Sequence, residues 1–231
     1  MAVTKRLAHF AASLKFESLR KEVVEQSKLC LMDWLGAALA GSSEPPSRIV
    51  ASIVRDMGGK GESTVIGTDI RTTSINAALA NGVAGHAVEL DDINEDSIVH
   101  PAASVMPAAL AIAERDGLRG ADLLTAIVVG YEIENRIGRA MNPSHYRYWH
   151  ATGTCGTFGA AAAAGRLLGL DEEGMAQAFG IAGTQAAGLI EVFGTMSKPL
   201  NPGKAAMNGV LAALLAQRGF TSSDSILEAE R

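Results

Sequence analysis

Apolar residues recur along almost the whole chain at the spacing of an amphipathic α-helix. In one segment the apolar positions i, i+3, i+4 and i+7 are Leu31, Trp34, Leu35 and Ala38. The same spacing recurs over residues 124–131 and 207–214. Residues at this spacing lie on one helical face, so the pattern predicts helices that pack through that face.

Glycines and prolines punctuate these segments. Left-handed C-caps favour glycine, and four glycines follow apolar runs: Gly41, Gly58, Gly117 and Gly219. A proline near a helix start costs little stability, because the N–H that it lacks would have no partner within the helix. Four prolines are expected at such positions: Pro46, Pro101, Pro107 and Pro202. Helices are predicted over 4–14, 19–40, 46–57, 74–89, 102–115, 121–141, 153–169, 171–188 and 203–218. A last short helix is expected near Ser223, and Ser63 to Gly67 is expected to be extended.

The predicted fold is an all-α, multi-helix bundle that forms a single domain over residues 1–231, with no βαβ unit. Small residues fill two of the helices. Residues 156–165 are almost all Gly or Ala, and Gly180, Thr184 and Gly188 recur at i, i+4 and i+8. These stripes predict close helix–helix contact in the core, and the same stripe would also suit a dimer interface.

Composition and charge narrow the class of protein. Hydrophobic residues make up 48% of the chain but aromatic residues only 5%, and the formal net charge is −5. The acidic balance argues against a nucleic-acid partner, although local cations can still attract an anionic substrate. Two cysteines, Cys30 and Cys155, are too few for a disulfide framework, which favours a reduced, cytoplasmic protein. No apolar run approaches the roughly 20 residues of a membrane span, so no membrane association is expected.

A group of carboxylates separates two histidines in residues 85–101. The segment reads Gly-His-Ala-Val-Glu-Leu-Asp-Asp-Ile-Asn-Glu-Asp-Ser-Ile-Val-His-Pro. Glu89 and Asp92 would share a face if the preceding helix extends through them. A carboxylate beside an imidazole fixes its tautomer and favours its charged form, which suits proton transfer near neutral pH. The alternatives are a solvated acidic loop with a helix-capping histidine, and a metal site, which no Cys pairing or His-x-x-x-His spacing supports.

Residues 142–154 combine aromatic rings, two histidines and an arginine. They include three of the five Tyr and Trp residues in the chain. The segment precedes a helix of small residues, whose N-terminus offers free N–H groups and a partial positive charge suited to a carboxylate. The alternative is an aromatic connector whose rings are simply buried.

Two lysines, Lys198 and Lys204, flank proline-containing turns just before an apolar helix. A lysine held there can pair with a carboxylate or take part in acid–base chemistry, and the alternative is an ordinary surface lysine. The sequence around Lys204 lacks the glycine spacing of a phosphate loop. The glycines at 153, 156 and 159 lack the preceding strand of a dinucleotide fingerprint.

Five ordered motifs together resemble the MmgE/PrpD family, which includes 2-methylcitrate dehydratase, cis-aconitate decarboxylase and iminodisuccinate epimerase. The motifs are His86-Ala-Val-Glu-Leu-Asp-Asp92, His100-Pro101 with Pro107-Ala-Ala-Leu110, His150-Ala-Thr-Gly-Thr154 with Phe158-Gly-Ala-Ala-Ala-Ala, Gly180–Gly188, and Lys198-Pro-Leu-Asn-Pro-Gly-Lys204. The resemblance extends over the whole chain. It implies the large helical domain of that family, and an enzyme that uses neither cofactor nor metal and acts on a small carboxylate substrate.

Matching motif positions imply a set of site residues. The implied catalytic residues are His100, His150, Lys198, Glu89 and Asp92. The implied substrate contacts are Asp91, Lys204, Asn201, Gly153 and Thr154. The expected reaction is dehydration of a small hydroxy di- or tricarboxylate such as 2-methylcitrate, in propionate catabolism. The histidines would transfer protons and Lys198 would stabilise carboxylate charge, with the acid and base assignments open.

Three departures from the family pattern keep other reactions open. Glu89 stands where Asp is frequent, Ile93 where Thr is common, and Asn201 where His is usual. They leave epimerisation or decarboxylation of a small dicarboxylate as alternatives to dehydration.

The family's enzymes also carry a second, α/β domain, which is expected to be missing from this chain. Without it the site would be open to water, which weakens its electrostatics. A homodimer is expected, and a separate second-domain polypeptide is a further candidate partner. A hypothesis of another class is a non-catalytic helical binding or dimerisation module. Convergence of His100, His150 and Lys198 on one concavity would favour the enzyme.

Overall fold

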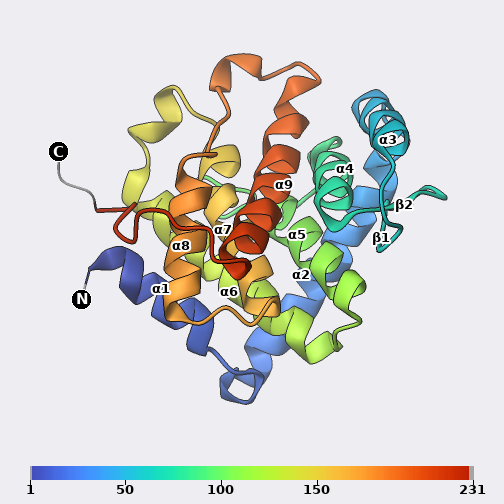
Figure 1. Ribbon diagram of the computed structural model, residues 1–231. Coiled ribbons are helices and arrows are strands. Elements are labelled where there is room, and N and C mark those ends of the chain that lie inside the picture. Colours follow the sequence, from blue (N-terminus) through green and yellow to red (C-terminus); the bar gives the residue numbers. More distant parts are fainter. Residues whose placement is uncertain (1, 229–231) are drawn as a thin grey trace.

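The computed structural model describes residues 2–228 and confirms the all-α bundle (Figure 1). The helices are α1 (Val3–Ser13), α2 (Lys21–Gly41), α3 (Pro45–Met57), α4 (Ser74–His86), α5 (Pro101–Asp116), α6 (Gly120–Met141), α7 (Ala151–Leu167), α8 (Glu172–Gly183) and α9 (Ser197–Gln217). Short 3-10 helices lie at Phe16–Ser18, His145–Arg147 and Ile190–Val192. Strands β1 (Ser63–Thr64) and β2 (Arg71–Thr72) pair antiparallel, so only the start of the predicted extended segment is a strand.

Helix α7 is the centre of the bundle and packs against α5, α6, α8 and α9 (Figure 1). All of its residues from Ala151 to Gly165 are buried. This is possible because their small side chains let neighbouring backbones approach closely. A Cβ atom on Gly209 of α9, for example, would lie 2.4 Å from the Cβ of Ala160 and 2.6 Å from the backbone nitrogen of Ala161. The Gly and Ala residues predicted to mediate helix–helix contact do so here.

Substitution of Gly209 by alanine is expected to lower the free energy of unfolding by about 2 kcal/mol, because overpacking typically costs about 1–3 kcal/mol and part of what the new methyl meets is backbone. Gly36→Ala is the matched control, since Gly36 lies in α2 and no atom of residues 2–228 lies within 4 Å of the added Cβ. That variant should gain about 0.5–1 kcal/mol from the reduced freedom of the unfolded chain. Urea unfolding measures both. Similar effects of the two variants would contradict this packing.

Three predicted helix boundaries are wrong. The helix predicted over 74–89 ends at His86, because Glu89 has a φ of 51°, which a right-handed helix cannot contain. Glu89 and Asp92 therefore share no helical face. The helix predicted over 171–188 ends at Gly183, so Gly188 (φ 127°) lies beyond it and the small-residue stripe is interrupted. The helix predicted over 203–218 begins six residues earlier, since α9 starts at Ser197. A proline in the first turn is tolerated there, because the first N–H groups of a helix have no intrahelical acceptor.

Further expectations fail along the chain. Pro107 and Pro202 lie inside α5 and α9 rather than at their starts. Residues 224–228 form turns, so the described part of the chain has no helix after Ser223, and residues 229–231 lie outside it. Among the described helices, none is long and apolar enough to cross a bilayer.

Candidate active site

Three helix ends meet around a cluster of imidazoles. His86 is the last residue of α4, His100 is the N-cap of α5, and His150 is the N-cap of α7. The ring centroid of His86 lies 4.9 Å from that of His100 and 5.7 Å from that of His150. Packing of α4, α5 and α7 thus brings together side chains that are far apart in the sequence.

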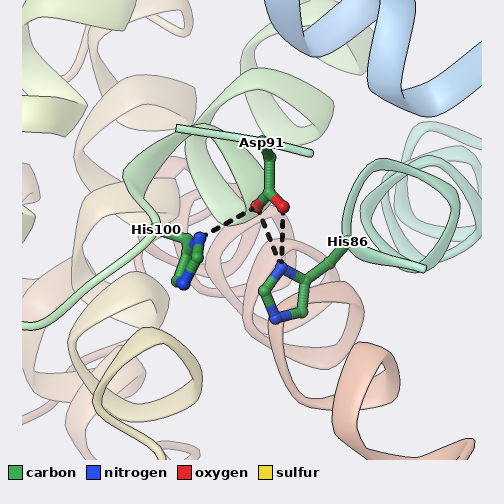
Figure 2. A group of neighbouring side chains, drawn as sticks. All are labelled: His86, Asp91 and His100. Carbon is green, nitrogen blue, oxygen red and sulfur yellow. Dashed lines mark hydrogen bonds and ion pairs between the residues drawn. The ribbon is translucent and has the colours of Figure 1, made fainter. Parts of the chain in front are cut away.

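A single carboxylate, that of Asp91, contacts two of these rings (Figure 2). The Nδ1 atom of His86 lies 2.9 Å and 3.1 Å from the two carboxylate oxygens, and the Nδ1 atom of His100 lies 3.6 Å from one of them. The side chains of His86 and Asp91 are fully buried. Because a carboxylate only accepts hydrogen bonds, the Nδ1 atom of His86 carries the proton.

Two buried ring nitrogens in this cluster have no hydrogen-bond partner among the described residues: Nε2 of His86 and Nδ1 of His100. Buried polar atoms in folded proteins are nearly always paired with protein, water or a ligand. The two nitrogens therefore mark a place where a polar ligand gains hydrogen bonds.

Lys198, in the first turn of α9, supplies positive charge beside the rings. Its ammonium pairs with the carboxylate of Glu89 and lies 4.9 Å from the ring centroid of Phe193. Phe193 in turn lies 4.9 Å from the ring of His150. The Lys198 side chain is 12% exposed and that of Glu89 is 55% exposed. A largely buried cation is thus paired with a carboxylate that reaches in from the surface.

Burial and mutual repulsion keep two of the imidazoles neutral. Burial, followed by repulsion from the protonated form of His86, from Lys198 and from the protonated form of His100, lowers the pKa of His150 to about 3. Burial also lowers the pKa of His100, although the negative charge of Asp91 opposes this effect. The hydrogen bond from Lys198 lowers the pKa of Glu89. The site thus combines the uncharged rings of His100 and His150 with the Lys198–Glu89 ion pair and the carboxylate of Asp91.

The neutral state of His150 makes folding stability depend on pH. Above about pH 6.5 the ring is uncharged in both the folded and the unfolded chain. Between about pH 6.5 and 3 only the unfolded chain takes up the proton, so stability falls by up to about 1.4 kcal/mol per pH unit. His150→Asn removes this titration and places at the N-cap of α7 a residue that is favoured there.

Urea unfolding at pH 7.5, 6 and 5 is therefore expected to show the stability advantage of the wild type over His150→Asn shrinking as the pH falls. A difference between the two proteins that is independent of pH would contradict the neutral assignment of His150.

The same cluster also contains a set of metal-ligating atoms. His86, Asp91 and His100 offer ligand atoms that lie within 4.8 Å of one another, and two imidazoles with a carboxylate suit a divalent metal. The charge of Lys198, however, already lowers the pKa of His100 and His150. Asp91 has the opposite effect on His100, so its carboxylate would attract a cation and Lys198 would repel it.

Asp92, expected to be catalytic, makes its hydrogen bonds outside the histidine cluster. One of its carboxylate oxygens accepts from the backbone nitrogen of Ala102 at 3.0 Å and the other from the hydroxyl of Tyr131 at 2.7 Å. Burial raises its pKa to about 6. Asp92 therefore ties the first turn of α5 to α6, which holds His100 and Asp91 in place.

Helix α6 holds the whole loop that carries Asp91 and His100. Four polar residues at i, i+3, i+4 and i+8 contact this loop or the start of α5: Tyr131 with Asp92, Glu134 with Ser104, Asn135 with Ser97, and Arg139 with Asp96. In the same loop Ile98, a β-branched residue, has a φ of 53°. This strained conformation persists only where surrounding contacts enforce it. The loop geometry is thus imposed by α6.

Removal of one of these contacts should cost stability. Tyr131→Phe deletes only the hydroxyl that donates to Asp92 and is expected to lower the unfolding free energy by about 1–3 kcal/mol, because a buried carboxylate loses a donor. Tyr148→Phe is the control, since Tyr148 is 68% exposed. Urea unfolding measures both variants, and an unchanged Tyr131→Phe protein would show that this hydrogen bond contributes nothing.

The residues expected to contact the substrate differ in whether they reach the histidine cluster. The amide N–H groups of Gly153 and Thr154 both donate to the carbonyl oxygen of His150, at 2.9 and 3.1 Å, so neither is free for a carboxylate. Lys204 is exposed on α9 and forms no ion pair with any other described residue. The amide nitrogen of Asn201 lies 3.1 Å from Nδ1 of His150, so Asn201 contacts the ring directly.

Some members of the cluster were not among the expected site residues. His86 is the first residue of the acidic motif and one of the two histidines that flank its carboxylates, and this position is a usable signal. His86 is absent from the expected site residues because these come from matched motif positions, which do not include it. Phe193 carries no signal in the sequence, because an aromatic residue in a glycine-containing connector is indistinguishable from a buried ring.

Comparison with known proteins shows which family this chain resembles over its length. The model of the MmgE/PrpD N-terminal domain matches residues 5–231. The cis-aconitate decarboxylase of Aspergillus terreus is 34% identical over 234 residues, which cover 98% of this chain and 48% of that protein. The cis-aconitate decarboxylase of Homo sapiens is 33% identical over 237 residues, 99% of this chain and 49% of that protein. The chain thus spans about half the length of the curated relatives it matches.

Proposed function

Because the chain belongs to the MmgE/PrpD family, we propose that its histidine cluster forms part of an active site that decarboxylates cis-aconitate or a closely similar unsaturated tricarboxylate. The observation that carries the proposal is the convergence of His86, His100 and His150 beside the ammonium of Lys198. The names of the similar decarboxylases favour this substrate over the 2-methylcitrate expected from the motifs.

The chemistry of the reaction matches these groups. Release of CO2 breaks a carbon–carbon bond and leaves its electron pair on the adjacent carbon. The pair is delocalised over the neighbouring double bond, and one proton is added at the far end. Lys198 would bind a carboxylate on which charge develops, and an imidazole would supply the proton. The carboxylates of the bound substrate would raise the pKa of nearby imidazoles, so substrate binding is coupled to proton uptake.

Dehydration of a hydroxy tricarboxylate such as 2-methylcitrate is the second candidate. The pair formed by His86 and Asp91 favours it, because a carboxylate that accepts from Nδ1 makes the opposite ring nitrogen a stronger base. Dehydration needs such a base to remove a proton beside a carboxylate, together with an acid to protonate the leaving hydroxyl.

The two reactions are separated by incubating the chain with each acid, alone and together with the C-terminal half of the Aspergillus terreus relative. Decarboxylation releases labelled CO2 from cis-aconitate, and dehydration produces alkene absorbance from 2-methylcitrate. A His150→Asn protein serves as the control for a side reaction. If neither acid is bound nor converted under either condition, the proposed function is wrong.

A further inference from the structure

The ring of His150 is fixed by an amide. The Nδ2 atom of Asn201, one turn beyond Lys198 on α9, lies 3.1 Å from Nδ1 of His150. The ring is 2% exposed, and its other close neighbours are the rings of Phe193 and His86. An amide N–H can only donate, so Nδ1 of His150 presents its lone pair to Asn201.

The position of the ring at a helix start favours the same arrangement. His150 is the N-cap of α7, and the N-terminus of a helix carries a partial positive charge. A lone pair on the ring nitrogen nearest the backbone is favoured there over an N–H. A neutral imidazole has only one proton, which must then be on Nε2.

We propose that Asn201 is a positioning residue that fixes His150 in the tautomer protonated at Nε2, so that His150 donates to the substrate and does not act as the base. The role toward substrate rests on the proposed function. The tautomer itself rests on the contact with Asn201, the position at the start of α7 and the neutral state of the ring, and not on the proposed function.

His86 is held in the opposite tautomer. Its Nδ1 donates to Asp91, and in the neutral form of the ring the lone pair is then on Nε2, the buried atom without a partner among the described residues. The two ring centroids lie 5.7 Å apart, so the rings offer one ligand an N–H from His150 and a lone pair from His86. His150 is then the donor and His86 the acceptor toward the ligand. The ring of His100 lies against Asp91, with its Nδ1 atom 3.6 Å from a carboxylate oxygen.

The tautomers can be read without substrate from long-range proton–nitrogen correlation spectra of the full chain with 15N-labelled histidine. We expect the proton on Nε2 of His150 and on Nδ1 of His86. Asn201→Asp replaces the donor by an acceptor of the same shape and should move the His150 proton to Nδ1. Asn208→Asp is the matched control, because Asn208 lies on the same helix and its amide donates to the carbonyl of Gln185. That variant should leave His150 unchanged.

A wild-type spectrum with the proton on Nδ1 of His150 would overturn the inference. So would an Asn201→Asp spectrum identical to that of the wild type. Under the condition in which the wild type converts its substrate, alone or with the C-terminal half of the relative, Asn201→Asp should lower kcat by about 100-fold with little change in KM, because the proton is lost from the reacting side of the ring. Absence of turnover in the wild type would refute the proposed function while leaving the tautomer result intact.

Discussion

Replacement of Lys198 by methionine is expected to lower kcat/KM for the tricarboxylate by about 10²- to 10³-fold, the usual effect of removing a donor that stabilises developing negative charge. The ammonium is largely buried beside the histidine cluster, so solvent screens it poorly. Methionine keeps the approximate length of the side chain and replaces the ammonium, which lies over the Phe193 ring, by an uncharged group. The expected loss of kcat/KM therefore measures the contribution of the Lys198 charge.

Lys204→Met is the matched control, because Lys204 lies on the same helix but is exposed. Its effect on kcat/KM is expected to stay below about twofold, since exposed charges are strongly screened. The comparison also tests the motif-based expectation that Lys204 contacts the substrate. Equal losses in the two variants, or a fully active Lys198→Met enzyme, would show that the buried ammonium is not the substrate cation.

Asp91→Asn is expected to lower activity by about 10³-fold and the unfolding free energy by about 2–3 kcal/mol. The amide nitrogen can donate to His86, which would reverse the tautomer of that ring and remove its free lone pair. His86 is fully buried, and a buried group that loses a charged hydrogen-bond partner is strongly destabilised. Steady-state kinetics and urea unfolding measure the two effects.

The control for this variant is Asp96→Asn, in the same loop. Asp96 pairs with Arg139 at the surface, where its side chain is 76% exposed. Exposed ion pairs contribute little, so its stability should change by less than about 1 kcal/mol and its activity hardly at all. An Asp91→Asn protein that behaves like Asp96→Asn would remove Asp91 from the site.

The helices could be predicted because each buries a face that repeats at the helical period. The end of α4 could not, because it depends on a tertiary contact. Glu89 turns out of the helix in a left-handed conformation and pairs with Lys198, which is distant in the chain. Local pattern at residues 87–89 is compatible with a longer helix, so nothing in the sequence marks the stop.

Tertiary contacts also decide why neighbouring residues of the same type make different interactions. Asp91 contacts two imidazoles, whereas Asp92, the next residue, anchors α5 and Tyr131. Lys198 and Lys204 differ in the same way along α9. Motif matching finds such pairs, but only packing decides which member faces the site. The polar positions on α6 do carry a sequence signal, because they interrupt an apolar helix at helical spacing.

The shared site is tested most directly by titrating the 15N-histidine-labelled chain with cis-aconitate. Signals of His86, His100 and His150 should shift together and saturate with one dissociation constant. His9, which pairs with Glu172 on the surface, should not respond. Separate binding curves for the three rings, or shifts confined to His9, would show that these imidazoles do not bind one ligand.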